Sequence, residues 1–482
     1  MKTRSRMMPM CAATLAVGAL ALLGVQPAEC QQTGPTASIQ TVSDTAAATL
    51  LGPYFEVDLS NPTGMNTIFT IGNTGAPSFF TSGMMTFVNQ NGPTAVLAHV
   101  SVWSDLGVPV FNFNIYLTGY DLERIDMRAL LTGTLPRTAT AGQDPNDTIS
   151  PKGRFSQDIN FASCTGGGGP GAILTSYPPL PPGALTAAQI ANLQSSLTGN
   201  ASTGNGGKCA GANHGDNIAR GYITIDTVNS CSAQFPGDPG YFTTTITDQS
   251  FQLTGETYYV DQLHAIARGE NMVHIHASSS DPLTTTSGNY TFYGRLNGFT
   301  ATDHRQPLAT TFTARFLNGN FNGAPAAAPS SPAWGVPPAS PPPGSTNLVV
   351  WRDPKTPEPY FTCGSLPSPY PLGQEGIVAF DDQEHPQTMG SGINPPLATF
   401  GSAFPIATQV VPVGGSALPT SYTSGWLFLN LNHTNAPGPT SDTAAAQAWV
   451  QVIEQNGSQI FNVMHRAQAQ DSATKAVHYT PH

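Results

Sequence analysis

The sequence predicts an all-β protein made of antiparallel β-sandwich domains, immunoglobulin-like or jelly-roll-like, with long Gly/Pro-rich loops and at most one short helix. Glycine and proline supply 49 and 43 of the 482 residues, a composition that disfavours helices and suits turns. Short runs rich in β-branched and aromatic residues recur between these turns. In residues 110–117 apolar and polar side chains alternate, so that Phe111, Phe113 and Ile115 share one face of a half-buried strand.

Residues 1–30 have the three parts of a secretory signal peptide. Basic side chains occur among the first six residues, and an apolar stretch runs from Cys11 to Val25. Small residues place the cleavage site after Ala28 or Cys30, and attachment of a lipid to Cys30 is an alternative. The apolar stretch is shorter than the roughly 20 residues of a stable membrane span. We therefore expect an exported protein, extracellular, on the cell surface or periplasmic, with no integral membrane span.

The charge of the chain narrows the choice of partners. Charged residues make up 10 % of the chain, against about 25 % in typical soluble domains, and the formal net charge is −11. Lysine and arginine form no cluster of the kind that neutralises phosphates. The sequence therefore predicts neither nucleic acid nor anionic lipid as a partner, and leaves cell-surface components or glycans as candidates.

The first β-rich block covers residues 49–164 and follows a flexible segment at 31–48. Its predicted strands are residues 54–59, 66–71, 84–90, 94–103 and 110–117. Asn91-Gly92 predicts a hairpin between the third and fourth of these strands, although Pro93 removes one hydrogen-bond donor.

Residues 165–208 interrupt the strand pattern as a Gly/Pro-rich insertion. Within it, residues 186–197 are the best helix candidate of the chain. Thr186 and Gln189 have the spacing of a capping box, and Gly199 follows as a stop signal.

Strands resume in a second block, 209–322, and in a C-terminal block, 347–466. A Pro/Ala-rich linker or loop at 323–346 separates the two, and a tail follows at 467–482. The predicted strands are residues 221–228, 241–253, 256–261, 271–278, 290–301, 309–317, 347–353, 376–386, 407–413, 425–432, 447–455 and 458–466. Asn456-Gly457 predicts a hairpin between the last two. The pattern leaves open whether the blocks are separate domains or share sheets.

Four cysteines follow the signal peptide, and in an exported protein an even set predicts two disulfides with three possible pairings. Cys164 and Cys209 bracket the insertion, so a bridge between them would tie its two ends together. We therefore predict a Cys164–Cys209 disulfide, which leaves Cys231 to pair with Cys363.

Two histidines two residues apart, His274 and His276, would project from one face of a strand. Their context, Gly-x4-His-x-His-x4-Asp-x6-Gly ending at Gly288, resembles the first metal-binding motif of the cupin family. The resemblance implies a double-sheet barrel with a divalent metal, with Asp281 in place of the family's glutamate and His304 as the remaining ligand. The alternation of the strand favours a different interpretation, in which Val273 and Ile275 pack inside and both imidazoles lie on a polar face that needs no metal. 

Two acidic clusters are candidates for structural calcium, because calcium prefers oxygen ligands. One follows a strand and contains Asp381, Asp382 and Glu384; the other contains Asp144, Asn146 and Asp147 in a turn-rich loop. Ordinary turns explain both clusters more simply. Apart from such calcium, the sequence predicts no cofactor.

The sequence contains no catalytic signature of the common hydrolase, metalloprotease or nucleotide-binding classes. The leading hypothesis is therefore a non-enzymatic bacterial surface or extracellular protein, structural or adhesive. A secreted cupin-like metal enzyme is the alternative. A carbohydrate-binding module is a further alternative, because surface aromatics stack on sugar rings. The candidate aromatics are Trp103, Trp351, Trp426, Tyr258 and Tyr259, most of which we expect in the core.

Overall fold

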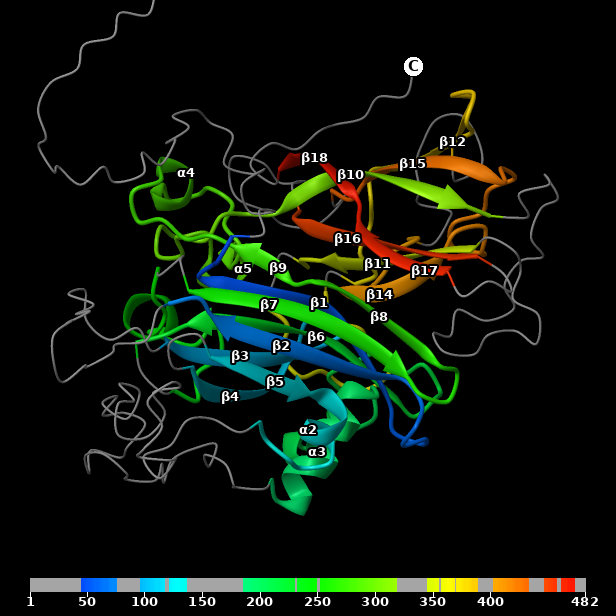
Figure 1. Ribbon diagram of the computed structural model, residues 1–482. Coiled ribbons are helices and arrows are strands. Elements are labelled where there is room, and N and C mark those ends of the chain that lie inside the picture. The colour runs from blue at the N-terminus through cyan, green and yellow to red at the C-terminus, as the bar shows by residue number, and fades with distance from the viewer. Residues whose placement is uncertain are drawn as a thin grey trace, which may run out of the picture. The chain divides into compact units, whose positions relative to one another are not determined.

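The computed structural model describes much of the chain beyond the predicted signal peptide, which itself lies outside the described residues. The described ranges are 45–75, 96–117, 121–136, 185–229, 232–248, 252–318, 345–354, 357–368, 370–388, 402–432, 446–456 and 461–472. Their strands form antiparallel sheets (Figure 1). The predicted all-β class is therefore confirmed, while the finer assignment to an immunoglobulin-like or jelly-roll-like sandwich stays a prediction.

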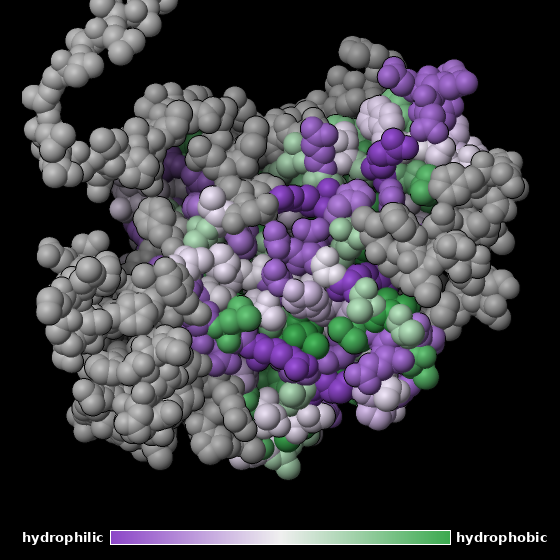
Figure 2. All heavy atoms as spheres, in the orientation of Figure 1, coloured by the Kyte–Doolittle hydropathy of each residue, from purple (hydrophilic) through white to green (hydrophobic). Residues whose placement is uncertain are grey.

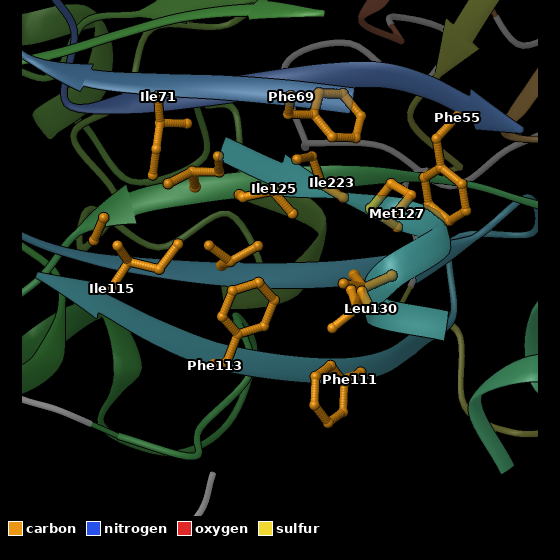
Figure 3. Packing of buried hydrophobic residues seen from close by; sticks show 14 of the residues in the cluster. Phe55, Phe69, Ile71, Phe111, Phe113, Ile115, Ile125, Met127, Leu130 and Ile223 are labelled. Atoms are coloured by element: carbon orange, nitrogen blue, oxygen red, sulfur yellow. The ribbon is translucent and has the colours of Figure 1, made fainter. Parts of the chain in front are cut away.

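The N-terminal part of the described chain contains two sheets that share one core. The first has the order β4 (Pro109–Leu117), β3 (Val96–Ser104), β6 (Ile218–Thr227), β1 (Thr49–Asp58), β9 (Val273–Ile275); the second has β5 (Leu122–Asp126), β2 (Asn66–Asn73), β7 (Leu253–Asp261), β8 (Ile266–Asn271). Phe55 and Ile223 of the first sheet and Phe69 and Ile125 of the second belong to one buried cluster, shown in Figure 3. Burying each such side chain stabilises the fold by roughly 1.5–3 kcal/mol.

Two further sheets share a second core. One has the order β13 (Pro386–Thr388), β12 (Gly376–Phe380), β15 (Ser424–Asn430), β10 (Ala309–Leu317), β18 (Gln468–Ser472); the other has β14 (Thr408–Pro412), β11 (Ser345–Arg352), β16 (Ala448–Asn456), β17 (Phe461–Arg466). Phe312 and Leu429 of the first and Val350 and Val450 of the second are buried in one cluster. The predicted hairpin around Asn456-Gly457 is confirmed as far as the structure describes it, because β16 and β17 pair antiparallel.

The β-rich blocks share sheets, which settles the question that the sequence left open. β1, from the first block, pairs with β6 and β9 of the second block. β10, from the second block, pairs with β15 of the C-terminal block and with β18. The segments predicted as a flexible start and as a tail also take part, since Ala47 is buried against Leu253 and β18 lies within residues 467–482.

A buried aromatic cluster connects the two pairs of sheets. Trp103 of β3 stacks on Tyr222 of β6 at a centroid distance of 5.6 Å, and Trp351 of β11 meets the Tyr222 ring edge-on at 5.9 Å. Arg295 lies 5.4 Å from the centroid of the Trp103 ring, and its Nε is 2.7 Å from an Asp353 carboxylate oxygen. Aromatic pairs of this geometry add about 0.5–1.5 kcal/mol beyond their burial, so this cluster holds the early and late strands together.

The predicted helix is present as α3 (Ala187–Leu197), and the Thr186–Gln189 capping box is confirmed. The expectation of at most one short helix is wrong. The described residues also contain α2 (Met127–Leu131), α4 (Pro282–Thr285), α5 (Gly294–Asn297) and the single helical turns η2 (Thr203–Asn205) and η3 (Tyr241–Thr245). α5 and η3 replace parts of the strands predicted at 290–301 and 241–253. At η3 the Thr244 hydroxyl donates to the Gly240 carbonyl, a local bond that competes with strand pairing.

The predicted Cys164–Cys209 disulfide is wrong, because Cys209 is bonded to Cys363. Cys209 also forms a two-bond antiparallel bridge with Phe361, and this bridge brings Cys209 next to Cys363, 154 positions away in sequence. Cys164 and Cys231 lie outside the described residues. Spatial neighbours decide disulfide pairing, and here they come from different blocks.

Candidate functional site

His274, the first predicted metal ligand, is a buried residue of β9 whose two ring nitrogens both make hydrogen bonds. Nδ1 lies 2.8 Å from the carbonyl oxygen of Thr45, and the Gly255 N–H donates to Nε2 at 3.3 Å. Because a carbonyl accepts, Nδ1 carries the proton and Nε2 uses its lone pair on the Gly255 N–H. The side chain is 5 % exposed, so the polar face on which the sequence places it is covered by a neighbouring strand and not by solvent. The neutral imidazole therefore links the Thr45 carbonyl to the Gly255 N–H of β7 through two hydrogen bonds.

The other three residues of the cupin-like motif also make hydrogen bonds to other groups of the protein. His276 Nε2 lies 3.0 Å from the Thr45 hydroxyl, and burial lowers the pKa of His276. His304 Nδ1 is 2.6 Å from an Asp248 carboxylate oxygen. Asp281 caps α4 by accepting from the Leu283 N–H. Within the part of the chain that the structure describes, no group of three or more histidine, cysteine, aspartate or glutamate side chains is placed to hold a metal.

The acidic cluster at Asp381 forms a hydrogen-bonded turn. One carboxylate oxygen of Asp381 accepts from the Gln383 and His385 N–H groups, and the other lies 2.9 Å from the His385 ring. Asp382 accepts from Ser424, and Glu384 has a φ of 66°, as the tip of a tight turn requires. These are the contacts that the turn interpretation expects. Asp144, Asn146 and Asp147 lie outside the described residues.

A fully buried polar cluster surrounds Asp226 on β6. Its carboxylate accepts hydrogen bonds from Tyr241 at 2.7 Å and Tyr293 at 2.8 Å, and Arg305 Nε lies 3.4 Å away. Burial raises the pKa of both tyrosines well above the usual value. Asp226 and Arg305 are 0 % exposed, so this cluster joins β6 to the segments that pack on it rather than meeting a ligand.

The candidate sugar-stacking aromatics divide by exposure. Trp103, Trp351 and Tyr259 are at most 3 % exposed and belong to the core, as the sequence predicts for most of them. Tyr258 is 39 % exposed, and Trp426 is half-buried. On the face seen in Figure 2 the hydrophobic residues are scattered among hydrophilic ones, without one broad apolar patch. Among the five candidate aromatics, Trp426 is therefore the best candidate for a binding site, because it lines a cavity.

Trp426 lines such a cavity, with a volume of about 790 Å³. The described residues that line it come from β10, β15, β16, β17 and β18, which lie near one another in Figure 1. They are Thr313, Ala314, Arg315, Leu317, Trp426, Glu454, His465, Arg466, Ala467 and Gln468. The volume is in the range of small-molecule sites, while the lining is more polar than in most of them.

Strand geometry explains why a cavity forms here. The chain leaves β17 and enters β18 through Ala467, passing from one sheet to the other. β18 pairs with β10 up to the Thr313–Gln468 pair, while β15 pairs with β10 as far as Leu317. The end of β10 beyond Thr313 therefore extends past its β18 partner, and the cavity lies at this corner.

Alternation along β10 decides which of its side chains share a face with Trp426. Phe312, Ala314 and Phe316 point into the second core, so Thr313 and Arg315 lie on the opposite face. Arg315 is exposed and is the direct cross-strand neighbour of Trp426. On its other side Trp426 stacks on Phe380 of β12, with centroids 3.9 Å apart and planes 9° apart. This stacking holds the indole in one orientation.

The described lining of the cavity contains more cationic than anionic side chains. Arg315 and Arg466 are cations, and Glu454 is an anion whose carboxylate lies 3.9 Å from His465 Nε2. The nearby Glu454 carboxylate raises the pKa of His465 above its usual value, against a smaller effect of burial. The lining therefore combines the Trp426 ring with two arginines and one glutamate.

Sequence reasoning identified Trp426 and missed the other residues of the cavity. A usable signal was present in residues 309–317, where the alternation around Arg315 places it opposite three apolar residues. No comparable signal brings Glu454 and His465 beside Arg315, because their proximity depends on pairing among β10, β15, β16 and β17.

Among the described residues, no helix is both long and apolar enough to cross a membrane. No protein-family model, curated protein or solved structure matches this chain. 

Proposed function

We propose that this chain is a non-enzymatic, exported adhesive protein of the bacterial surface or surroundings, and that it binds a glycan in the cavity at Trp426. The single observation that carries the proposal is the geometry of that cavity. It combines an indole stacked on Phe380 with hydrogen-bonding side chains at the corner between two sheets. 

Sugar rings match this lining for chemical reasons. The C–H groups on one face of a pyranose are slightly positive and pack on the negative face of an aromatic ring. The hydroxyl groups at the rim of the sugar need partners, which Thr313, Gln468 and Glu454 can supply. Mixed aromatic and polar linings of this kind orient a ligand without requiring a reaction.

Two other features support export and bear on the enzyme alternative. Disulfides persist in oxidising compartments, so the Cys209–Cys363 bond supports export together with the predicted signal peptide. The cupin-like enzyme would use His274 as a ligand, and the two hydrogen bonds of that imidazole count against this role. 

A glycan array followed by calorimetry on the bound sugars tests the proposal. We expect the wild-type protein to bind a subset of glycans and Trp426→Ala to weaken that binding at least tenfold. Tyr258→Ala, at an exposed aromatic on β7 away from the cavity lining, is the matched control and should bind normally. Failure of the wild-type protein to bind any glycan, or equal binding by Trp426→Ala, would refute the proposed function.

A further inference from the structure

We infer that the glycan recognised in this cavity carries a carboxylate on its sugar ring, as a uronic acid does, and that Arg315 and Arg466 bind that carboxylate. This inference rests on the proposed function and adds the chemical class of the ligand. Its basis is the composition of the lining and the placement of Arg315 beside Trp426.

The charge of the lining contrasts with that of the whole chain. The protein has a formal net charge of −11, with 18 lysines and arginines in 482 residues. Two of these cations, Arg315 and Arg466, line this cavity, and the acidic group facing them from the described lining is Glu454. Glu454 is also within reach of His465, at 3.9 Å. The described lining therefore carries one more cationic than anionic side chain, apart from the effect of Glu270 of β8 on His465, and this excess favours an anionic ligand.

The positions of Arg315 and Trp426 indicate where the carboxylate of the ligand lies relative to its sugar ring. Arg315 and Trp426 are directly opposite each other on neighbouring strands, and such pairs have Cβ atoms about 4.5–5.5 Å apart. In a uronic acid one carbon–carbon bond separates the ring from the carboxylate. A pyranose packed on Trp426 therefore places its carboxylate within reach of the long Arg315 side chain.

Arginine also suits a carboxylate better than a neutral hydroxyl. Its planar guanidinium donates two parallel N–H bonds to the two carboxylate oxygens, and such charged bonds are roughly twice as strong as neutral ones. Arg315 is exposed before binding and Arg466 is half-buried, so a bound carboxylate would be partly shielded from water. Partial shielding strengthens the ion pair relative to one on an open surface.

The test compares a uronate oligosaccharide, its carboxyl-reduced neutral form and a sulfated oligosaccharide of the same length, by calorimetry. We expect the uronate to bind at least tenfold more tightly than the neutral form. Arg315→Gln should remove most of that difference while changing the affinity for the neutral form less than twofold. Arg315→Lys keeps the charge but cannot donate two parallel N–H bonds to the carboxylate, so it should give an intermediate affinity. Arg124→Gln, at an exposed arginine of β5, is the charge-matched control and should behave as wild type.

The outcomes separate the inference from the proposed function. Equal binding of the uronate and its neutral form, unaffected by Arg315→Gln, would overturn the inference and leave glycan binding intact. Tighter binding of the sulfated sugar than of the uronate would overturn the carboxylate assignment. Absence of binding to all three sugars and to the array would overturn both. A thermal melt of Arg315→Gln matching wild type within about 2 °C shows that the variant is folded.

Discussion

Glu56 is an ionisable residue buried in the interior of β1. It is 2 % exposed, and one of its carboxyl oxygens accepts a hydrogen bond from the Tyr54 hydroxyl at 2.7 Å. Burial raises the pKa of Glu56 from 4.5 to about 7, against the opposing effects of Arg220 and of the Tyr54 hydrogen bond. The folded protein therefore holds a proton on this group at pH values where the unfolded chain releases it.

This difference predicts a stability that falls as pH rises from about 4.5 to about 7. In that window the folded state binds more protons than the unfolded state, so the free energy of unfolding decreases by roughly 3 kcal/mol across it. Urea denaturation at several pH values measures the slope, and Glu56→Gln should remove this contribution. Glu256→Gln, at an exposed position of β7, is the control and should keep the wild-type slope. An unchanged slope in Glu56→Gln would contradict the assignment.

His274 gives a second prediction for a single residue. Its removal leaves the buried Gly255 N–H without its imidazole acceptor, so His274→Ala should lower the free energy of unfolding by about 1–3 kcal/mol. His276→Ala, at a half-buried position, should cost less. Thermal melts with and without a chelator make the measurement, and we expect the chelator to change neither variant. A chelator-dependent drop in wild type that disappears when both histidines are removed would instead support a metal site.

At the scale of elements, the sequence predicts strands well where local periodicity is strong. The alternation of residues 309–317 matches β10, and the capping box of Thr186 and Gln189 starts α3 as predicted. The strand prediction fails where a local hydrogen bond favours another conformation. At Thr244 the hydroxyl donates to the Gly240 carbonyl and stabilises a helical turn in a segment rich in strand-forming residues. The cavity was not predictable because its residues meet through pairings between distant strands.

The Cys209–Cys363 disulfide connects the segment after α3 to the segment between β11 and β12. It closes a loop of 154 residues, for which the chain-entropy model gives a stabilisation of roughly 5 kcal/mol. We expect Cys209→Ser/Cys363→Ser to lower the free energy of unfolding by about 3–5 kcal/mol in urea denaturation. Each single serine variant should lose nearly as much as the pair, because either one breaks the same bond. A double variant as stable as wild type would show that the bond does not constrain the unfolded chain.

At the scale of the whole molecule, shared sheets should keep the two halves of the chain together after a cut between them. β10 pairs with β15 and β18, and Trp351 packs on Tyr222, so contacts cross the predicted linker at 323–346. A protease site introduced into that linker, in the Cys209→Ser/Cys363→Ser background, allows the test. 

After cleavage, the two fragments should co-elute in gel filtration in native buffer and separate in urea. The same protein without the inserted site, treated with the protease, is the control. Separation of the fragments in native buffer would show that the shared sheets contribute too little to hold the halves together.

The shared sheets also set the order in which the chain acquires structure during synthesis. Leu50 of β1 pairs with His274, and Phe312 of β10 pairs with Ala469. At ribosomal rates of about 5–20 residues per second, β1 waits on the order of 10–45 s for β9 to be made. During that time its edge is open to wrong pairing. The first pair of sheets can therefore be completed only when β9 is present, and the second pair only when β18 is present.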